Sequence, residues 1–80
     1  MKDKIEIRWT KAANEMLQNR KIVKVRYMTE KERDELDWSS RPVVLQLDDG
    51  NLIFPSADDE GNEGGAMFTN DVKVPVLPVI

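Results

Sequence analysis

One stretch of this sequence decides its fold: Pro42-Val43-Val44-Leu45-Gln46-Leu47-Asp48-Asp49-Gly50-Asn51-Leu52-Ile53-Phe54. Two apolar runs in this stretch are separated by an Asp-Gly turn, which is the strongest short-range sequence indication of a β-hairpin. Apolar and polar residues alternate along the first run, as expected for a strand that buries one of its faces. Pro55 then ends the second strand or confines it to a sheet edge. The stretch therefore predicts two antiparallel strands.

Residues 21–28, upstream of the hairpin, predict the clearest further strand because β-branched residues dominate them. Between this strand and the hairpin, Thr29 and Glu32 have the spacing of a capping box, which predicts a short surface helix running to about Leu36. Trp38 follows that helix. We expect Trp38 to plug one end of the β core rather than to offer an exposed stacking surface.

At the N-terminus, Ile5, Ile7 and Trp9 alternate with charged residues, which predicts a short half-buried strand. Thr10 would then cap a helix over about 11–19. The apolar side of that helix would consist of Ala12, Ala13, Met16 and Leu17.

The C-terminal third predicts a short strand at 66–68 and an extended segment over 72–80. Pro75 and Pro78 restrict that segment to edge or polyproline-like geometry. Because so small a domain needs apolar area, we expect this tail to complete the core. The alternative is an exposed edge that is offered to a partner.

These expectations add up to one domain spanning residues 1–80, with five or six short strands and one or two short helices. The fold class predicted is mainly β, a small SH3-like antiparallel barrel. A small α+β roll is the alternative. A parallel βαβ arrangement is disfavoured, because no helix of crossover length separates the strands of the second half.

The composition argues against catalysis, because the chain holds neither cysteine nor histidine. Thiolate metal sites, Cys nucleophiles and a Ser-His-Asp triad cannot be built without those residues. We therefore expect no enzyme, no catalytic residue and no cofactor. The start of the chain has no signal-peptide pattern, and no apolar run approaches the ~20 residues of a membrane span. A cytoplasmic protein that has no membrane partner is expected.

An acidic, glycine-rich loop over residues 58–65 separates the hairpin from the C-terminal third. Its residue types favour turns, and loops on a rigid scaffold often carry function. The EF-hand register fails in this loop because neither possible start supplies the closing Glu, so no metal site is predicted. A solvated turn is the main interpretation, with Gly61, Gly64 and Gly65 at positive φ, and a weak cation site is the alternative. The candidate residues are Asp58, Asp59, Glu60 and Asn62.

Charge is unevenly distributed along the chain. Residues 1–41 hold eleven Lys or Arg and eight Asp or Glu, a balance of +3, whereas residues 42–80 hold one Lys and seven acids, a balance of −6. We expect the two halves to pack together so that their charges offset. A basic face for a polyanion is the alternative, with aromatic stacking as in nucleic-acid-binding barrels. An overall acidic balance disfavours that alternative. The residues such a face would use are Arg20, Lys24, Arg26, Arg41 and Trp38.

Two segments of the chain resemble a group of small bacterial proteins of unknown function. The first runs from Leu17 through Val25-Arg26-Tyr27-Met28-Thr29 to Trp38 and Arg41-Pro42, and the second joins Leu47-Asp48-Asp49-Gly50 to Pro55-Ser56 and the acidic loop. The resemblance covers about residues 16–68. It implies a compact SH3-type barrel and no particular activity, substrate or cofactor.

The expected function is that of a small non-enzymatic binding or accessory module with another protein as its partner. Such a module would present an exposed apolar edge or groove near Trp38 or over residues 74–80. Nucleic-acid binding through the basic strand 20–26 is the alternative.

Overall fold

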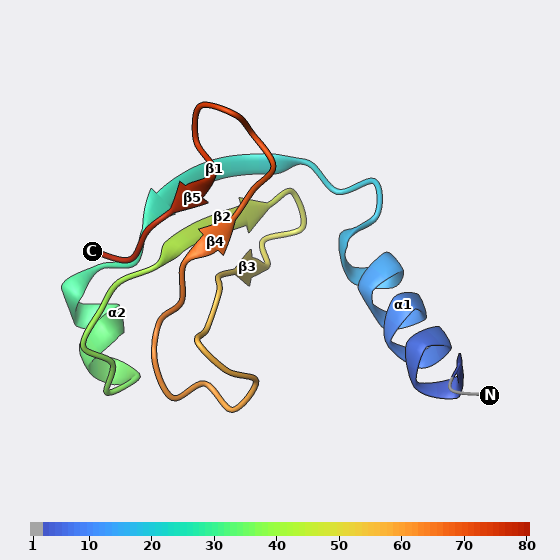
Figure 1. The fold of residues 1–80 in the computed structure, drawn as a ribbon, viewed down its shortest axis with the longest axis horizontal. Helices are drawn as coiled ribbons and strands as arrows, with labels where there is room; N and C mark the ends of the chain where they lie inside the picture. The colour runs from blue at the N-terminus through green and yellow to red at the C-terminus, as the bar shows by residue number, and fades with distance from the viewer. Residues whose placement is uncertain (1–2) are drawn as a thin grey trace.

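The computed structural model describes residues 3–80, which form two helices and five strands (Figure 1). In chain order the elements are α1 (Asp3–Leu17), β1 (Ile22–Tyr27), α2 (Glu30–Glu35), β2 (Val43–Leu47), β3 (Leu52–Ile53), β4 (Met67–Phe68) and β5 (Val76–Leu77).

The predicted hairpin is confirmed and forms part of a three-stranded antiparallel sheet of order β1-β2-β3. Gly50 adopts a φ of 91° in the turn between β2 and β3, a conformation that glycine reaches without a steric penalty. In the β1–β2 pair, Val25 lies opposite Leu45 and Tyr27 opposite Val43. A register irregularity between Ile22 and Lys24 marks a β-bulge at the start of β1.

The predicted capping box is also confirmed. The Thr29 hydroxyl accepts a hydrogen bond from the Glu32 backbone N–H at 3.1 Å, and the Glu32 carboxylate accepts one from the Thr29 N–H at 2.9 Å. These two bonds satisfy N–H groups that the first turn of a helix leaves without partners. They explain why so polar a segment forms the short helix α2.

The C-terminal tail returns to the three-stranded sheet. The strands β4 and β5 pair with each other in a separate two-stranded sheet. Beyond β5, Ile80 exchanges two backbone hydrogen bonds with Arg41, of 2.8 and 2.9 Å. The hydroxyl of Tyr27 donates to the carbonyl of Pro78 at 2.8 Å. These bonds attach the tail to the body of the fold. No residue of 72–80 is buried, however, so the expectation that the tail completes the core is not confirmed.

The core is small. Met28, Trp38 and Val44 form its buried cluster, and the ring of Trp38 meets Phe54 edge to face with 6.0 Å between centroids. Trp38 is only 6% exposed, so the expectation that it is buried is confirmed.

The predicted SH3-like barrel is wrong. The five strands form two separate antiparallel sheets, and no strand pairs with the outer edge of β1 or of β3 to close a barrel within residues 3–80. The fold class is α+β. Two physical features prevent closure: β3, β4 and β5 are two residues long, and the polar, glycine-rich stretch after Pro55 forms a loop instead of a long strand.

The predicted N-terminal strand is wrong as well. Residues 3–17 form one continuous helix, α1. Alternation over Ile5, Ile7 and Trp9 competes with a longer helical pattern, in which Ile5, Trp9, Ala12 and Met16 follow one another at i, i+4, i+7 and i+11. The helical pattern prevails because it extends over four turns, whereas the alternation covers five residues.

Candidate functional site

The helix α1 carries an apolar side that nothing in the described chain covers. We call Ile5, Trp9, Ala12 and Met16 the apolar stripe. No residue of α1 is buried, and Ile5 and Trp9 remain 73% and 61% exposed. In Figure 1, α1 extends away from both sheets. An isolated helix of this length is marginal in water, so the stripe is a surface that would gain stability from a partner.

A line of three cations borders the apolar stripe. Lys4, Arg8 and Lys11 follow one another at i, i+4 and i+7, which places them together on one flank of the helix. The guanidinium of Arg8 lies 5.3 Å from the centroid of the Trp9 ring, within cation–π range. We call these three residues the cationic line. A surface made of the stripe and this line suits an apolar groove that has acidic side chains at its border.

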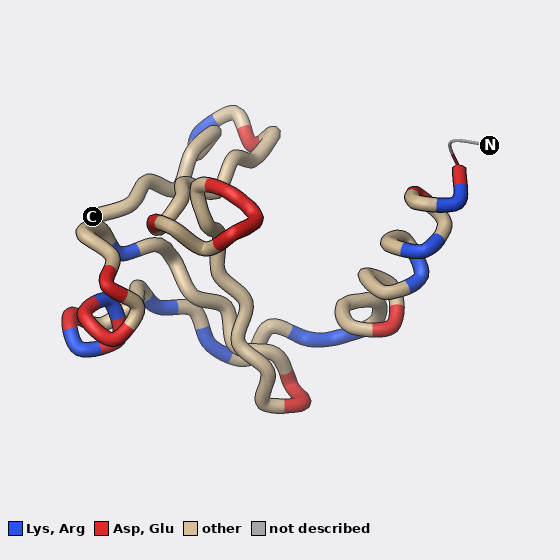
Figure 2. Tube along the Cα trace, turned by 90° about the horizontal axis from the view of Figure 1, so that it is seen from below, with Lys and Arg blue, Asp and Glu red and all other residues tan. Residues whose placement is uncertain are grey.

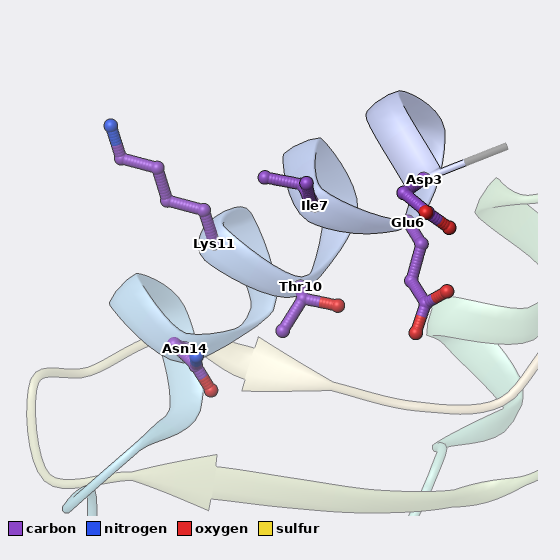
Figure 3. Close-up of a pocket in the computed structure, with 6 residues that line it drawn as sticks. All are labelled: Asp3, Glu6, Ile7, Thr10, Lys11 and Asn14. Carbon is purple, nitrogen blue, oxygen red and sulfur yellow. The ribbon is translucent and has the colours of Figure 1, made fainter. Parts of the chain in front are cut away.

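The opposite side of α1 is mainly polar. Figure 3 shows its residues, which all belong to this one helix and therefore form an open surface rather than a cavity between elements. They are Asp3, Glu6, Ile7, Thr10, Lys11 and Asn14.

The direction in which α1 leaves the body is fixed by the turn that follows it. Asn19 ends the helix with a φ of 65°, in the left-handed region that Asn tolerates better than most residues. The guanidinium of Arg20 lies 3.6 Å from a carboxylate oxygen of each of Asp48 and Asp49. The N–H of Asp48 also donates to the carbonyl of Lys21 at 2.9 Å. These contacts tie the base of α1 to the β2–β3 turn.

A second apolar surface is concave. A cleft of about 180 Å³ opens between α2, β2 and β3. We call it the α2 cleft. Leu36, Leu52 and Phe54 each leave a substantial part of their side chain exposed there, at 45%, 41% and 39%. Its lining consists of Met28, Glu32, Glu35, Leu36, Val44, Leu52 and Phe54, so five apolar side chains are accompanied by two carboxylates.

The basic strand predicted from the sequence is interrupted by acids. Arg20 and Arg26 are each engaged by carboxylates, and the guanidinium of Arg41 donates to the carbonyl of Met28 at 3.3 Å. Lys24 is exposed and enters no ion pair within residues 3–80. Figure 2 shows cations on α1 and along the chain into β1, and acidic stretches on the loops of the body. The structure does not gather these four cations into one uninterrupted patch.

The pairing of Arg26 with Glu32 is the strongest of these contacts. Two guanidinium nitrogens donate to the two carboxylate oxygens at 2.8 and 3.0 Å, a bidentate geometry. The hydrogen bond from Arg26 and that from the Thr29 N–H lower the pKa of Glu32 to about 2, and the same contact raises the pKa of Arg26. Arg26 is thus committed to holding α2 against β1.

Trp38, the predicted stacking residue, presents no stacking surface, and neither does Tyr27. Trp38 is buried, and its Nε1–H donates to the carbonyl of Gly61 at 2.8 Å. Tyr27 lies on the sheet face opposite to Lys24 and Arg26, where its hydroxyl is bonded to the C-terminal tail. Both rings stabilise the fold, because their polar atoms bond to the acidic loop and to the C-terminal tail.

The acidic loop is organised by its own side chains. Asp58 accepts hydrogen bonds from the N–H groups of Glu60 and Asn62 at 3.0 and 3.2 Å, and from the Asn62 side chain at 2.9 Å. The side-chain bond from Asn62 is the main cause that lowers the pKa of Asp58. Asp59 is exposed. These local bonds agree with the solvated-turn interpretation.

The three glycines of this loop do not share one role, which corrects the expectation of positive φ at all of them. Only Gly61 has it, at 76°. At Gly64 a Cβ would lie 2.9 Å from Cδ of Pro42, and at Gly65 a Cβ would lie 2.7 Å from the carbonyl carbon of Ser56. Gly64 is therefore required by the close approach of the Pro42 ring, and Gly65 by that of the Ser56 backbone.

Glu63 is the acidic residue that connects this loop to the rest of the fold. Its carboxylate accepts hydrogen bonds from the N–H and hydroxyl groups of both Ser39 and Ser40, and from the N–H of Gly64, at 2.7 to 3.1 Å. The bond from the Ser39 side chain is the largest cause that lowers its pKa, to about 2. The hydroxyls of Ser39 and Ser40 thus both donate to this one carboxylate.

Within residues 3–80, no set of three or more acidic side chains is placed to hold a metal ion. No helix of the described chain combines the length and the apolar character that crossing a membrane requires.

Two important features were missed by the sequence reasoning. The apolar stripe was missed because residues 5–9 were assigned to a strand, although the spacing 5, 9, 12, 16 was a usable signal. Glu63 was not singled out, and no local pattern could have identified it, because its partners are 23 and 24 residues away in the sequence.

Comparisons of this chain with protein-family models, with curated proteins and with solved structures give no match.

Proposed function

We propose that this protein is a small non-enzymatic interaction module that binds a protein partner through the apolar stripe of α1. The observation that carries the proposal is the exposure of that stripe, where Ile5 and Trp9 remain 73% and 61% accessible. Trp and Arg are the residues most enriched among those that dominate binding energy, and Trp9 lies beside Arg8 here.

The chemistry of α1 defines the partner that would fit. The stripe would lie in an apolar groove, as amphipathic helices do in helix-in-groove recognition. The cationic line on its flank would meet acidic side chains at the border of that groove, which supports specificity and association rate more than affinity.

The α2 cleft supports protein recognition better than small-molecule binding. Its volume of about 180 Å³ lies below the ~300–1,000 Å³ that is typical of small-molecule pockets. A space of this size accommodates one large side chain of a partner protein.

Nucleic-acid binding remains the alternative. Exposed Lys24 and the cationic line favour it, but carboxylates hold Arg20 and Arg26. A polyanion would have to displace those carboxylates. The salt dependence of binding to a short single-stranded oligonucleotide tests this alternative, because phosphate contacts weaken steeply as salt increases.

Site-specific photo-crosslinking tests the proposal. A benzophenone amino acid is placed at Ala12 in the apolar stripe or, as the matched control, at Asn14 on the opposite, polar side, and each protein is irradiated in an extract of cells that produce it. We expect defined protein adducts from position 12 that are absent from position 14 and that form again with the purified partner. Equal labelling from both positions, or none from either, would refute the proposal.

A further inference from the structure

We infer that the protein partner of α1 is a second copy of this chain: the apolar stripe of each copy lies in the α2 cleft of the other, and Trp9 is the side chain that enters it. The inference rests on the proposed function, because it names the partner of the same surface.

The two halves of such a contact are present in one chain. The stripe is a convex apolar surface whose largest side chain is Trp9, and the α2 cleft is a concave apolar surface of about 180 Å³. Both are exposed, since Leu36, Leu52 and Phe54 in the cleft remain 39–45% accessible. A large aromatic side chain in a pocket of matching size is the usual centre of a protein interface.

The charges of the two surfaces are complementary. Two carboxylates, Glu32 and Glu35, line the cleft from α2, and the cationic line borders the stripe. Glu32 is held by Arg26, whereas Glu35 enters no ion pair within the described residues. Because the guanidinium of Arg8 lies 5.3 Å from the centroid of the Trp9 ring, docking Trp9 in the cleft would bring this cation close to the carboxylates that line it, of which Glu35 is the one without an ion pair.

The body of the fold carries the excess of acid. Residues 22–80 have a balance of −6, whereas α1 holds three cations and three acids. Electrostatic attraction between copies therefore depends on the cationic line of one copy facing the acidic body of the other.

The geometry directs α1 to a neighbouring molecule instead of its own body. Asn19 and the contacts of Arg20 with Asp48 and Asp49 fix the exit of the helix, and Figure 1 shows α1 and α2 at opposite ends of the structure. In a dimer with a two-fold axis, each copy can place its apolar stripe in the α2 cleft of the other, so that both stripes and both clefts are covered. That arrangement closes as a dimer and leaves neither surface open to further copies.

Sedimentation velocity on the full chain tests the inference, with three variants that each place Glu at an exposed apolar position. Trp9→Glu removes the anchor and Leu36→Glu blocks the cleft. Val72→Glu is the matched control, because Val72 is 95% exposed and distant from both surfaces in the sequence. Circular dichroism verifies that each variant is folded. We expect the parent and Val72→Glu to be dimers, and dissociation constants at least about thirtyfold weaker for the other two.

Mixing the two defective variants gives the decisive observation. An equimolar mixture of Trp9→Glu and Leu36→Glu contains one intact pair of surfaces. These are the apolar stripe of Leu36→Glu and the α2 cleft of Trp9→Glu. We therefore expect a heterodimer weaker than the parent dimer, at concentrations where each variant alone is a monomer. A mixture that stays monomeric would overturn the inference.

A charge exchange checks the orientation. Arg8→Glu and Glu35→Lys should each weaken the dimer roughly two- to fivefold, the range of exposed ion pairs, and the double variant should recover affinity. Failure of the double variant to recover would refute the pairing of Arg8 with Glu35.

The second-copy inference and the proposed function can fail separately. A parent that is monomeric at all accessible concentrations, together with crosslinks from position 12 to a different protein, would overturn the second-copy inference and leave the proposed function standing. A monomeric parent without any position-specific crosslink would overturn both. A monomer in which the α2 cleft is occupied by its own α1 would also refute the inference, since the contact would lie within one chain.

Discussion

The carboxylate of Glu63 accepts hydrogen bonds from Ser39 across 24 residues of chain, at 3.0 Å from its backbone N–H and at 2.7 Å from its hydroxyl. Ser40 donates to the same carboxylate through its N–H at 3.0 Å and its hydroxyl at 2.9 Å. Because Ser39 and Ser40 precede β2, this one side chain joins the acidic loop to the three-stranded sheet. The loop is therefore part of what stabilises the fold.

Replacing Glu63 by Gln should lower the melting temperature by several degrees. The amide keeps the shape of the carboxylate, but one of its two positions is a donor and would face the N–H and hydroxyl donors of Ser39 and Ser40. Thermal unfolding followed by circular dichroism measures the effect. Glu60→Gln is the matched control, since among residues 3–80 the Glu60 side chain accepts a hydrogen bond from Asn62 of the same loop and from no other element. Equal losses in the two variants would contradict the role assigned to Glu63.

The stability of the protein should fall as the pH is lowered from about 5 to about 2. Glu63 and Glu32 both have a folded-state pKa of about 2, against an ordinary value of 4.5. Over this interval the unfolded chain binds more protons than the folded one, so the free energy of unfolding decreases as the pH falls. Above pH 5 both carboxylates are ionised in either state, and their contribution is fully present.

Urea unfolding at pH 7, 5, 4 and 3 measures this dependence. In Glu63→Gln the slope between pH 5 and pH 3 should become shallower, because only the contribution of Glu32 remains from this pair. An unchanged slope in Glu63→Gln would mean that Glu63 has the same pKa in the folded and unfolded states.

Gly65→Ala should destabilise the protein more than Gly61→Ala does. A Cβ at position 65 would lie 2.7 and 2.8 Å from the carbonyl carbon and oxygen of Ser56, so backbone must move, at a cost of about 2–3 kcal/mol. Position 61 has open space around it and a φ of 76°, so Ala there costs only the strain of that conformation, about 1 kcal/mol. Denaturant unfolding of both variants measures which one loses more free energy of unfolding. A larger loss for Gly61→Ala would show that a Cβ fits beside Ser56 without moving the backbone.

Trp38→Ala should remove about 3–5 kcal/mol from the free energy of unfolding, the range for deleting a large buried aromatic side chain. Its ring packs with Met28, Val44 and Phe54, and its Nε1–H bonds to the carbonyl of Gly61. Trp38→Phe keeps most of the apolar contact and loses the hydrogen bond, so its cost should be smaller, about 1 kcal/mol for the bond together with the lost ring area. Denaturant unfolding compares the two variants. Equal stability of Trp38→Phe and Trp38→Ala would exclude a packing role for the ring.

Local patterns predicted the elements that depend on neighbouring residues in the sequence. The Asp-Gly hairpin and the capping box of Thr29 and Glu32 were found because their hydrogen bonds close within a few residues. The barrel was not correctly predicted, because closure depends on pairing between distant strands. The segments after Pro55 offer only two-residue ladders for such pairing.

The contacts of the candidate site residues divide in the same way, into those that are local in the sequence and those that depend on tertiary structure. The bonds of Asp58 and Asn62 within the acidic loop were predictable from residue type. The pairing of Arg26 with Glu32 and of Arg20 with Asp48 and Asp49 was not, because it depends on how β1 meets α2 and the β2–β3 turn. The cations of residues 20–26 are therefore close in sequence but do not form a continuous basic patch, because carboxylates lie against Arg20 and Arg26.

The melting temperature of the full chain should rise with protein concentration, and Trp9→Glu should remove that rise. Any partner that binds only the folded state stabilises it by mass action, and in a dimer the partner is the protein itself. At low concentration the parent and Trp9→Glu should melt at the same temperature, because Trp9 is 61% exposed and belongs to a helix with no buried residue. At high concentration only the parent gains stability. A difference already present at low concentration would mean that α1 stabilises its own body, and parallel curves at all concentrations would exclude a second copy as the partner.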